Sequence, residues 1–202
     1  MSLIVSGIRL PFDEPEAAAL EKARRLTGLA ERDTEAAVCR VSIDARRGQI
    51  SRVYSVRLDA HCDEKAFAEK LQVPFVRYKE NAEPEIPCGE KRMEHRPVVV
   101  GLGPAGLFAA YTLAKYGYRP IVLERGGDMD ERDRAVDRFW NGGALDPECN
   151  IQFGEGGAGA YSDGKLTTRI GDALCETVLK TLAEHGAPAD IVKKAKPHVG
   201  TD

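Results

Sequence analysis

Three glycines, Gly101, Gly103 and Gly106, have the spacing of a G-x-G-x-x-G loop. In such a loop the first glycine permits a tight turn, the second lets the main chain approach a pyrophosphate, and the third lets a helix pack closely on a strand. The free N–H groups and the dipole at a helix start attract the anion. Glu124 is placed to accept hydrogen bonds from an adenosine ribose, and its charge disfavours NADP, whose ribose carries a 2′-phosphate.

The elements that must position these residues are present in the required order. The wholly apolar run 98–100 predicts a short strand covered on both faces, as in a parallel sheet. An Ala- and Leu-rich helix ending near Gly117 follows the glycines, and residues 120–123 predict a second strand that leads to Glu124. This order favours a dinucleotide site over the alternative, a structural βαβ unit without ligand.

Residues 97–126 resemble the FAD-binding fingerprint of glutathione-reductase-like flavoproteins, with Pro and Ala at the fourth and fifth positions and Glu-Arg ending the second strand. The resemblance implies that Glu124 holds the FAD ribose and that the FAD pyrophosphate contacts Gly101, Gly103, Pro104, Ala105 and Gly106. Arg125 borders the adenine or a phosphate in this interpretation. A solvated surface arginine is an equally good interpretation of Arg125.

A second glycine cluster lies in NIQFGEGGAGAYSDGKL, residues 150–166. Its composition permits positive φ values and close contact with a flat or anionic ligand, but also fits a flexible surface loop. The segment resembles a family of uncharacterised FAD-dependent dehydrogenases with an N-terminal ferredoxin-like domain, and residues 42–46 and 197–202 fit that family too. The resemblance implies contact with the flavin or pyrophosphate, for which the candidates are Gly156, Gly157, Ser162, Asp163 and Lys165.

Two basic residues have further candidate roles. Lys165 is a candidate to stabilise negative charge on the reduced flavin, or is a solvated side chain. Arg132, on an expected helix over residues 128–141, is a candidate phosphate contact. The five cysteines include no CxxxxC pair and no zinc-ligand spacing, so we expect neither a thiol relay nor a metal. No catalytic acid or base can be assigned.

The fold class is α/β, with an N-terminal ferredoxin-like α+β domain followed by an incomplete FAD/NAD(P)-binding Rossmann-like βαβ domain. Residues 1–80 predict the order βαββαβ, which is that of a ferredoxin-like domain. A linker spans residues 81–96, and residues 97–202 form the N-terminal part of the FAD-binding domain. Its last expected helices are 172–186 and 188–195. We expect a truncated product that binds FAD weakly or not at all and turns over little.

Composition excludes few function classes. Hydrophobic residues make up 43% and charged residues 30% of the sequence, as in an ordinary folded protein. The formal charge of -3 gives no pull toward nucleic acid or anionic membrane. There is no run of 18 apolar residues and no basic N-terminal region, so we expect a cytoplasmic protein with no membrane partner.

The expected function is that of an FAD-dependent oxidoreductase acting on an unknown small-molecule substrate, with NAD(P)H as candidate reductant. One alternative is a flavin monooxygenase. Another is a non-catalytic module that binds nucleotide, or binds RNA through the basic hairpin residues Arg40, Arg46, Arg47, Arg52 and Arg57. The hairpin carries no RNP-like aromatic motif, so nucleic acid is the less favoured partner.

Overall fold

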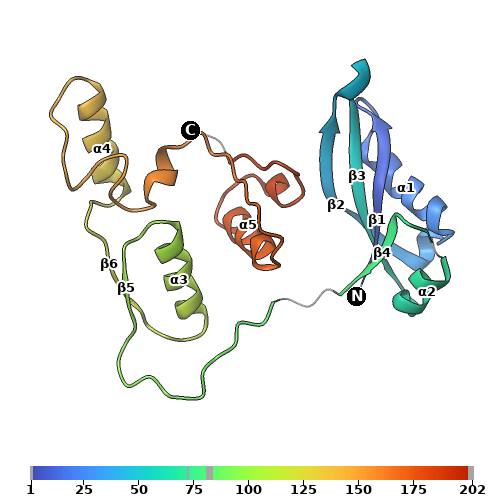
Figure 1. Ribbon diagram of the computed structural model, residues 1–202, viewed down its shortest axis with the longest axis horizontal. Helices are drawn as coiled ribbons and strands as arrows, with labels where there is room; N and C mark the ends of the chain where they lie inside the picture. The colour runs from blue at the N-terminus through green and yellow to red at the C-terminus, as the bar shows by residue number, and fades with distance from the viewer. Residues whose placement is uncertain (1, 72, 81–83, 200–202) are drawn as a thin grey trace. The chain divides into compact units, whose positions relative to one another are not determined.

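The computed structural model describes the chain except for residues 1, 72, 81–83 and 200–202. It is mixed α/β, and the described residues contain a four-stranded antiparallel sheet and five α-helices (Figure 1). The chain divides into two compact units. One comprises Met1–Ile86 and Leu166–Val199, and the other contains Pro87–Lys165.

The first unit is built on the four-stranded sheet. Its elements in chain order are β1 (Ser2–Pro11), α1 (Glu16–Thr27), β2 (Thr34–Asp44), β3 (Ser51–Ala60), α2 (Glu64–Leu71) and β4 (Val76–Lys79). The strands lie in the order β2-β3-β1-β4, and each neighbouring pair is antiparallel. The predicted succession of strands and helices over residues 1–80 is therefore confirmed.

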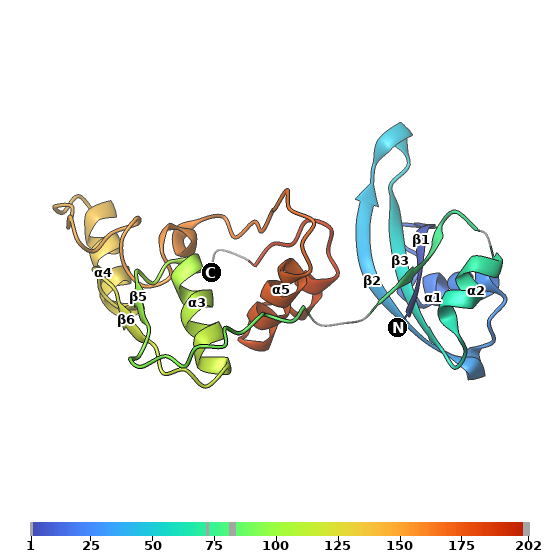
Figure 2. The same ribbon diagram turned by 60° about the horizontal axis from the view of Figure 1, so that its bottom comes forward.

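Alternating apolar side chains hold this sheet to its helices. Leu3, Val5, Val56 and Leu58 are fully buried, and Ala23 of α1 lies in the same core. Helices α1 and α2 cover the same face of the sheet (Figure 2). Helix α1 ends at Thr27, because the next residue, Gly28, adopts a left-handed conformation with φ of 73°.

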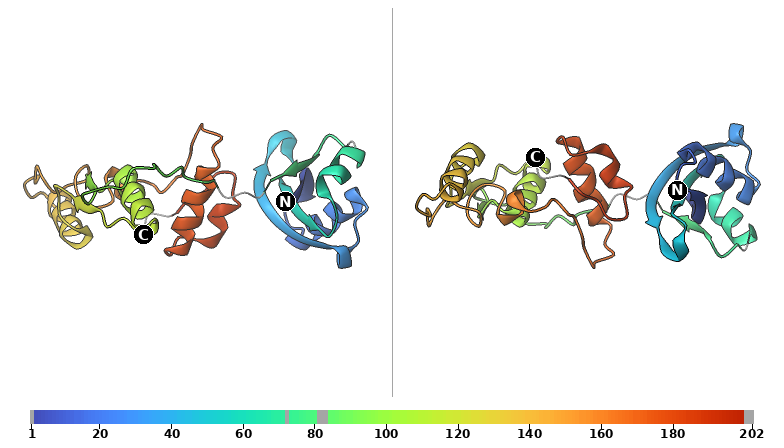
Figure 3. Two further views of the ribbon diagram at one scale, coloured as in Figure 1. Left: turned by 90° about the horizontal axis from the view of Figure 1, so that it is seen from below. Right: turned by 90° about the horizontal axis from the view of Figure 1, so that it is seen from above.

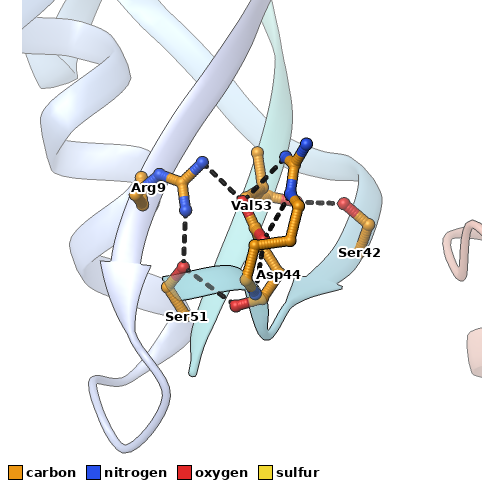
Figure 4. Close-up of polar contacts among 6 residues, drawn as sticks. Arg9, Ser42, Asp44, Ser51 and Val53 are labelled. Atoms are coloured by element: carbon orange, nitrogen blue, oxygen red, sulfur yellow. Dashed lines mark hydrogen bonds and ion pairs between the residues drawn. The ribbon is translucent and has the colours of Figure 1, made fainter. Parts of the chain in front are cut away.

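A carboxylate fixes the end of the β2–β3 hairpin (Figure 4). Asp44 accepts hydrogen bonds from the Arg46 guanidinium at 2.9 and 3.0 Å and pairs with Arg9 at 2.7 Å. Arg9 also donates to the Ser51 hydroxyl at 2.9 Å. The bonds from Arg46, and then that from Arg9, hold the pKa of Asp44 well below its ordinary value.

The segment Leu166–Val199 belongs to this unit instead of the second one, which differs from the expected domain of 97–202. It carries α5 (Leu174–Glu184) and η4 (Ala189–Val192), which lie side by side (Figure 3). The main chain of Val41 donates to Lys193 at 2.7 Å and accepts from Ala195 at 2.9 Å. The expected helix 188–195 is wrong and is reduced to a 3-10 helix over Ala189–Val192, because the main chain around Lys194 pairs with Val41 of β2 instead of continuing the helix.

The second unit contains the glycine segments. Its elements are β5 (Val98–Val100), α3 (Pro104–Lys115), β6 (Ile121–Leu123), α4 (Met129–Trp140) and η3 (Ala158–Tyr161). Strands β5 and β6 pair in parallel, as predicted. Burial of the strand on both faces is not observed within the described chain, since Val98 is 56% and Val100 81% exposed. No further strand pairs with β5 or β6 among the described residues.

Candidate dinucleotide-binding site

The first glycine makes the turn between β5 and α3. Gly101 has φ of 91°, a conformation that residues with a side chain rarely adopt. Its N–H donates to the carbonyl of Leu123 at 2.7 Å, which continues the pairing of β5 with β6. The loop therefore begins at the carboxyl end of both parallel strands, where ligands bind in open α/β sheets.

The third glycine allows the helix to approach this turn. A Cβ atom at Gly106 would lie 1.9 Å from the Gly101 carbonyl oxygen, far inside contact distance. Helix α3 begins with Pro104, whose missing N–H and fixed φ suit the first helical position. Gly103 is the N-cap residue and offers no side-chain hydrogen bond to the helix.

Helix α3 thus starts with open main-chain donors. Among the described residues, no hydrogen bond is made by the N–H groups of Gly103, Ala105 or Gly106. The first N–H groups of a helix lack partners within it, and the helix dipole adds partial positive charge at the same place. This end of α3 is suited to an anion that accepts several N–H bonds.

Glu124 is bonded to the same loop. Its Oε2 atom accepts from the Leu102 N–H at 2.6 Å, and Oε1 accepts from the Gly126 N–H at 2.9 Å. The hydrogen bond from Gly126, followed by that from Leu102, lowers the pKa of the Glu124 carboxyl. A carboxylate has about four acceptor positions. The N–H groups of Arg125 and Gly154 also act on this carboxylate, so Glu124 holds the first loop and the second glycine segment together.

The second glycine cluster lies directly against the first. The N–H of Gly156 donates to the Leu102 carbonyl at 2.9 Å. A Cβ at Gly157 would lie 2.9 Å from the Gly103 Cα atom, so the two main chains are in contact. Gly156 and Gly157 also have positive φ values of 83° and 67°. Two segments that are separate in the sequence thus form one continuous main-chain surface at the start of α3.

Arg132 has a different role from the expected phosphate contact. Its side chain is 0% exposed. Its guanidinium donates to the carbonyls of Asn150 at 2.9 Å, Ile151 at 2.7 Å and Glu155 at 2.5 Å, and lies 3.5 Å from that of Gly154. Because carbonyl oxygens of the protein accept these hydrogen bonds, Arg132 binds the second glycine segment and is not available to a phosphate.

The remaining basic candidate of the first motif, Arg125, is held at the surface. It pairs with Glu148 at 2.8 Å, and its guanidinium carbon lies 3.9 Å from the centroid of the Phe153 ring. The side chain therefore covers the segment that leads to the second glycine cluster. The structure gives it an ordered position instead of the freely solvated one that the sequence allowed.

The three polar candidates near residue 163 lie beyond η3. The Ser162 hydroxyl donates to the Gly159 carbonyl at 2.8 Å and accepts from the Gly164 N–H at 3.2 Å. Lys165 pairs with Asp163 at 2.5 Å. These bonds join neighbours in sequence, so they shape the turn itself and do not bring the three side chains to the start of α3.

Tyr161 and Asn150 complete the site and were missed by the sequence interpretation. The Tyr161 hydroxyl donates a short hydrogen bond to Asp133, and its ring lies 4.8 Å from the Arg132 guanidinium carbon. Burial, with the bond to Asp133 next, raises the pKa of Tyr161 to about 12. The Asn150 amide oxygen accepts from the Gln152 N–H at 2.8 Å. One sequence signal could have indicated these contacts. Arg132 shares a face of α4 with the buried residues Ala135 and Val136, so its side chain needs partners inside the protein.

Two further features, metal-ligand clusters and membrane-spanning helices, would point to other functions. Within the described part of the chain, no group of three or more His, Cys, Asp or Glu side chains could hold a metal. None of the described helices has the length and apolar character needed to cross a membrane.

Three of the five hairpin arginines contact other side chains of the protein. Arg46 pairs with Asp44 at 2.9 Å, Arg57 with Asp59 at 3.0 Å, and Arg52 lies 4.4 Å from the Phe12 ring centroid. The side chain of Arg47 lies outside the described residues. These pairings do not favour a free basic face for RNA.

The chain is similar to part of a longer protein. No family model matches the chain. An uncharacterised protein of Clostridium beijerinckii is 45% identical over 206 residues, an alignment that covers all of this chain and 38% of the relative. The chain therefore spans less than two fifths of the length of the protein it matches.

Proposed function

We propose that the chain is the ADP-binding part of an FAD-dependent oxidoreductase. The observation that carries the proposal is the contact of Gly157 with Gly103 beside three N–H groups that make no hydrogen bond among the described residues. A diphosphate needs close approach to the main chain, which glycine permits, and N–H groups that are available as hydrogen-bond donors.

The residues of the loop have distinct roles in this proposal. The N–H groups of Gly103, Ala105 and Gly106 bind the diphosphate, and Pro104 fixes the start of the helix. Glu124 binds the adenosine ribose while its bonds to Leu102 and Gly126 hold the loop. FAD, when bound, supplies hydride-transfer chemistry, with NAD(P)H as reductant and a small molecule as substrate.

The domain assignment is part of the proposal. The first unit is a ferredoxin-like domain, because the order β1-α1-β2-β3-α2-β4 folds into an antiparallel sheet of order β2-β3-β1-β4. The second unit is the start of a Rossmann-like FAD-binding domain, supported by the parallel pairing of β5 with β6 and the glycine loop between β5 and α3. We also propose a cytoplasmic location, because the odd count of five cysteines favours reduced thiols.

A titration with ADP tests the binding site. The chain, labelled with 15N, is titrated with ADP while amide shifts are recorded by NMR, which also detects weak binding. We expect the largest shifts at Gly103, Ala105 and Gly106. Shifts that are absent, or confined to the first unit, would contradict the proposed site.

The oxidoreductase activity is tested on the longer protein. The full-length Clostridium beijerinckii relative is purified and its visible absorbance recorded before and after addition of NADH or NADPH. We expect bound oxidised flavin that is bleached by one of the two. A colourless protein that takes up no added FAD would refute the proposal, whereas oxygen uptake coupled to substrate consumption would identify a monooxygenase.

A further inference from the structure

The buried guanidinium of Arg132 is the starting point. An unpaired charge inside a protein is costly, and main-chain carbonyl oxygens compensate the charge of Arg132. Arginine presents five N–H donors in a rigid plane. The Arg132 guanidinium contacts the carbonyl oxygens of Asn150, Ile151, Gly154 and Glu155, so one side chain determines the path of the segment that precedes Gly156.

Close packing around Gly154 leaves this segment little room to take another path. A Cβ at Gly154 would lie 2.7 Å from the Arg132 Cδ atom, and a Cβ at Gly126 would lie 2.5 Å from the Gly154 Cα atom. The Glu155 N–H donates to the Gly127 carbonyl at 3.1 Å. The segment is therefore held between the Arg132 side chain on one side and Gly126 and Gly127 on the other.

Tyr161 supports Arg132 from the other end of the glycine cluster. Its hydroxyl donates to Asp133, the residue next to Arg132, and its ring faces the guanidinium at 4.8 Å. The ring also makes an edge contact with Trp140, with centroids 6.3 Å apart. Both ends of the segment from Asn150 to Tyr161 are thus attached to α4.

We propose that Arg132, supported by Tyr161, is a positioning residue that holds Gly156 and Gly157 against Leu102 and Gly103, and so sets the form of the diphosphate subsite. That the ligand is a diphosphate rests on the proposed function, whereas the positioning of Gly156 and Gly157 by Arg132 does not. Arg132 itself touches no ligand. Its effect is transmitted through the Gly156 bond to Leu102 and the contact of Gly157 with Gly103.

Arg132→Lys tests the inference, because lysine keeps the charge but replaces the planar fork by one ammonium group. Amide hydrogen exchange is measured without ligand, and we expect Glu155 and Gly156 to exchange about tenfold faster than in the parent chain. ADP affinity, from the NMR titration, is expected to fall about tenfold. Adenosine affinity is expected to remain unchanged, since adenosine lacks the diphosphate. Arg134→Lys, at an exposed position of the same helix, is the matched control and is expected to change none of these.

The possible outcomes separate the two proposals. If the parent chain binds no ADP, the proposed function fails while hydrogen exchange still decides the role of Arg132. Unchanged exchange at Glu155 and Gly156 would overturn the inference, as would equal weakening of ADP and adenosine or an unchanged ADP affinity. If Arg132→Lys does not fold, Tyr161→Phe takes its place. Exchange at Gly156 is then expected to rise, and an unchanged rate in that folded variant overturns the inference.

Discussion

At the scale of single residues, the glycines of the first motif differ in what they require. Gly106 has no room for a side chain, whereas Gly103 has φ of -72° and its nearest neighbour to an added Cβ is Gly157 Cα at 3.8 Å. The protein itself therefore tolerates alanine at residue 103. The requirement for glycine there arises from the ligand, in the proposed function.

This difference predicts that alanine at residue 106 lowers stability, whereas alanine at residue 103 lowers ADP affinity. Gly106→Ala is expected to destabilise the second unit by about 1–3 kcal/mol, because the Cβ would overlap the Gly101 carbonyl. Gly103→Ala is expected to change stability by less than about 0.5 kcal/mol and yet weaken ADP binding. Urea denaturation and the ADP titration measure the two effects.

Gly89→Ala serves as the control for both glycine substitutions, since no atom lies within 4 Å of an added Cβ there. The assignment of Gly103 would fail if Gly103→Ala bound ADP as well as Gly89→Ala does. The packing explanation would fail if Gly106→Ala were as stable as the parent chain.

Glu124 predicts a pH dependence of stability. Its folded pKa is lowered by the N–H groups of Gly126 and Leu102, so the unfolded state binds the proton more readily. The stabilisation is complete above the ordinary carboxyl pKa and is lost as pH falls through the lower, folded pKa. Urea denaturation of Glu124→Gln and the parent chain across this range should show a difference that shrinks with acidification. A difference that grows on acidification would contradict the assignment.

At the scale of elements, the two units are held together differently. The first has a core of fully buried side chains such as Leu58, at 0% exposure. In the second, β5 and β6 have three residues each, and Leu123 is 53% exposed. Hydrogen bonds and glycine contacts, more than apolar burial, therefore hold the described part of the second unit.

Two leucines provide a matched comparison of the elements. Leu58→Ala is expected to cost about 2–5 kcal/mol, because it leaves a cavity in a closed core. Leu123→Ala is expected to cost less than about 0.5 kcal/mol, because its side chain is largely solvated in the described chain. Thermal and urea unfolding would measure both. Similar costs at the two positions would show that β6 is buried against something else, such as a second copy of the chain.

The elements also show how far the sequence is informative. Strand β1 and helix α1 could be predicted because β-branched and aliphatic residues mark the strand and Gly28 can end the helix. The contact of Gly157 with Gly103 was only implied by resemblance, since no side-chain pattern encodes contact between two main chains. Arg132 was assigned to a phosphate because a charged side chain suggests an external partner, and only the packing shows that its partners are internal carbonyls.

At the scale of the whole molecule, the first unit is discontinuous in sequence. Its second segment adds main-chain bonds to the edge of β2 at Val41 and an ion pair of 3.1 Å between Lys193 and Glu16. Pairing through the main chain leaves no apolar pattern, so the sequence could not place residues 166–199 with this unit.

Hydrogen exchange tests this attachment. Ala195→Pro removes the N–H that donates to the Val41 carbonyl, and is expected to speed exchange of the Val41 amide. The Leu58 amide, in the central strand β3, is expected to keep its rate and acts as the internal control. A Val41 amide that already exchanges freely in the parent chain would contradict the attachment.

The strand order carries a consequence for biosynthesis. Strand β1 is synthesised before β3 and β4, the two strands between which it lies in the sheet. Until Lys79 has emerged, Leu3, Val5 and the apolar side chains near them have no completed sheet to enter. The nascent chain must keep these residues from aggregating during that interval, and a chaperone that binds short aliphatic segments would find a target in β1.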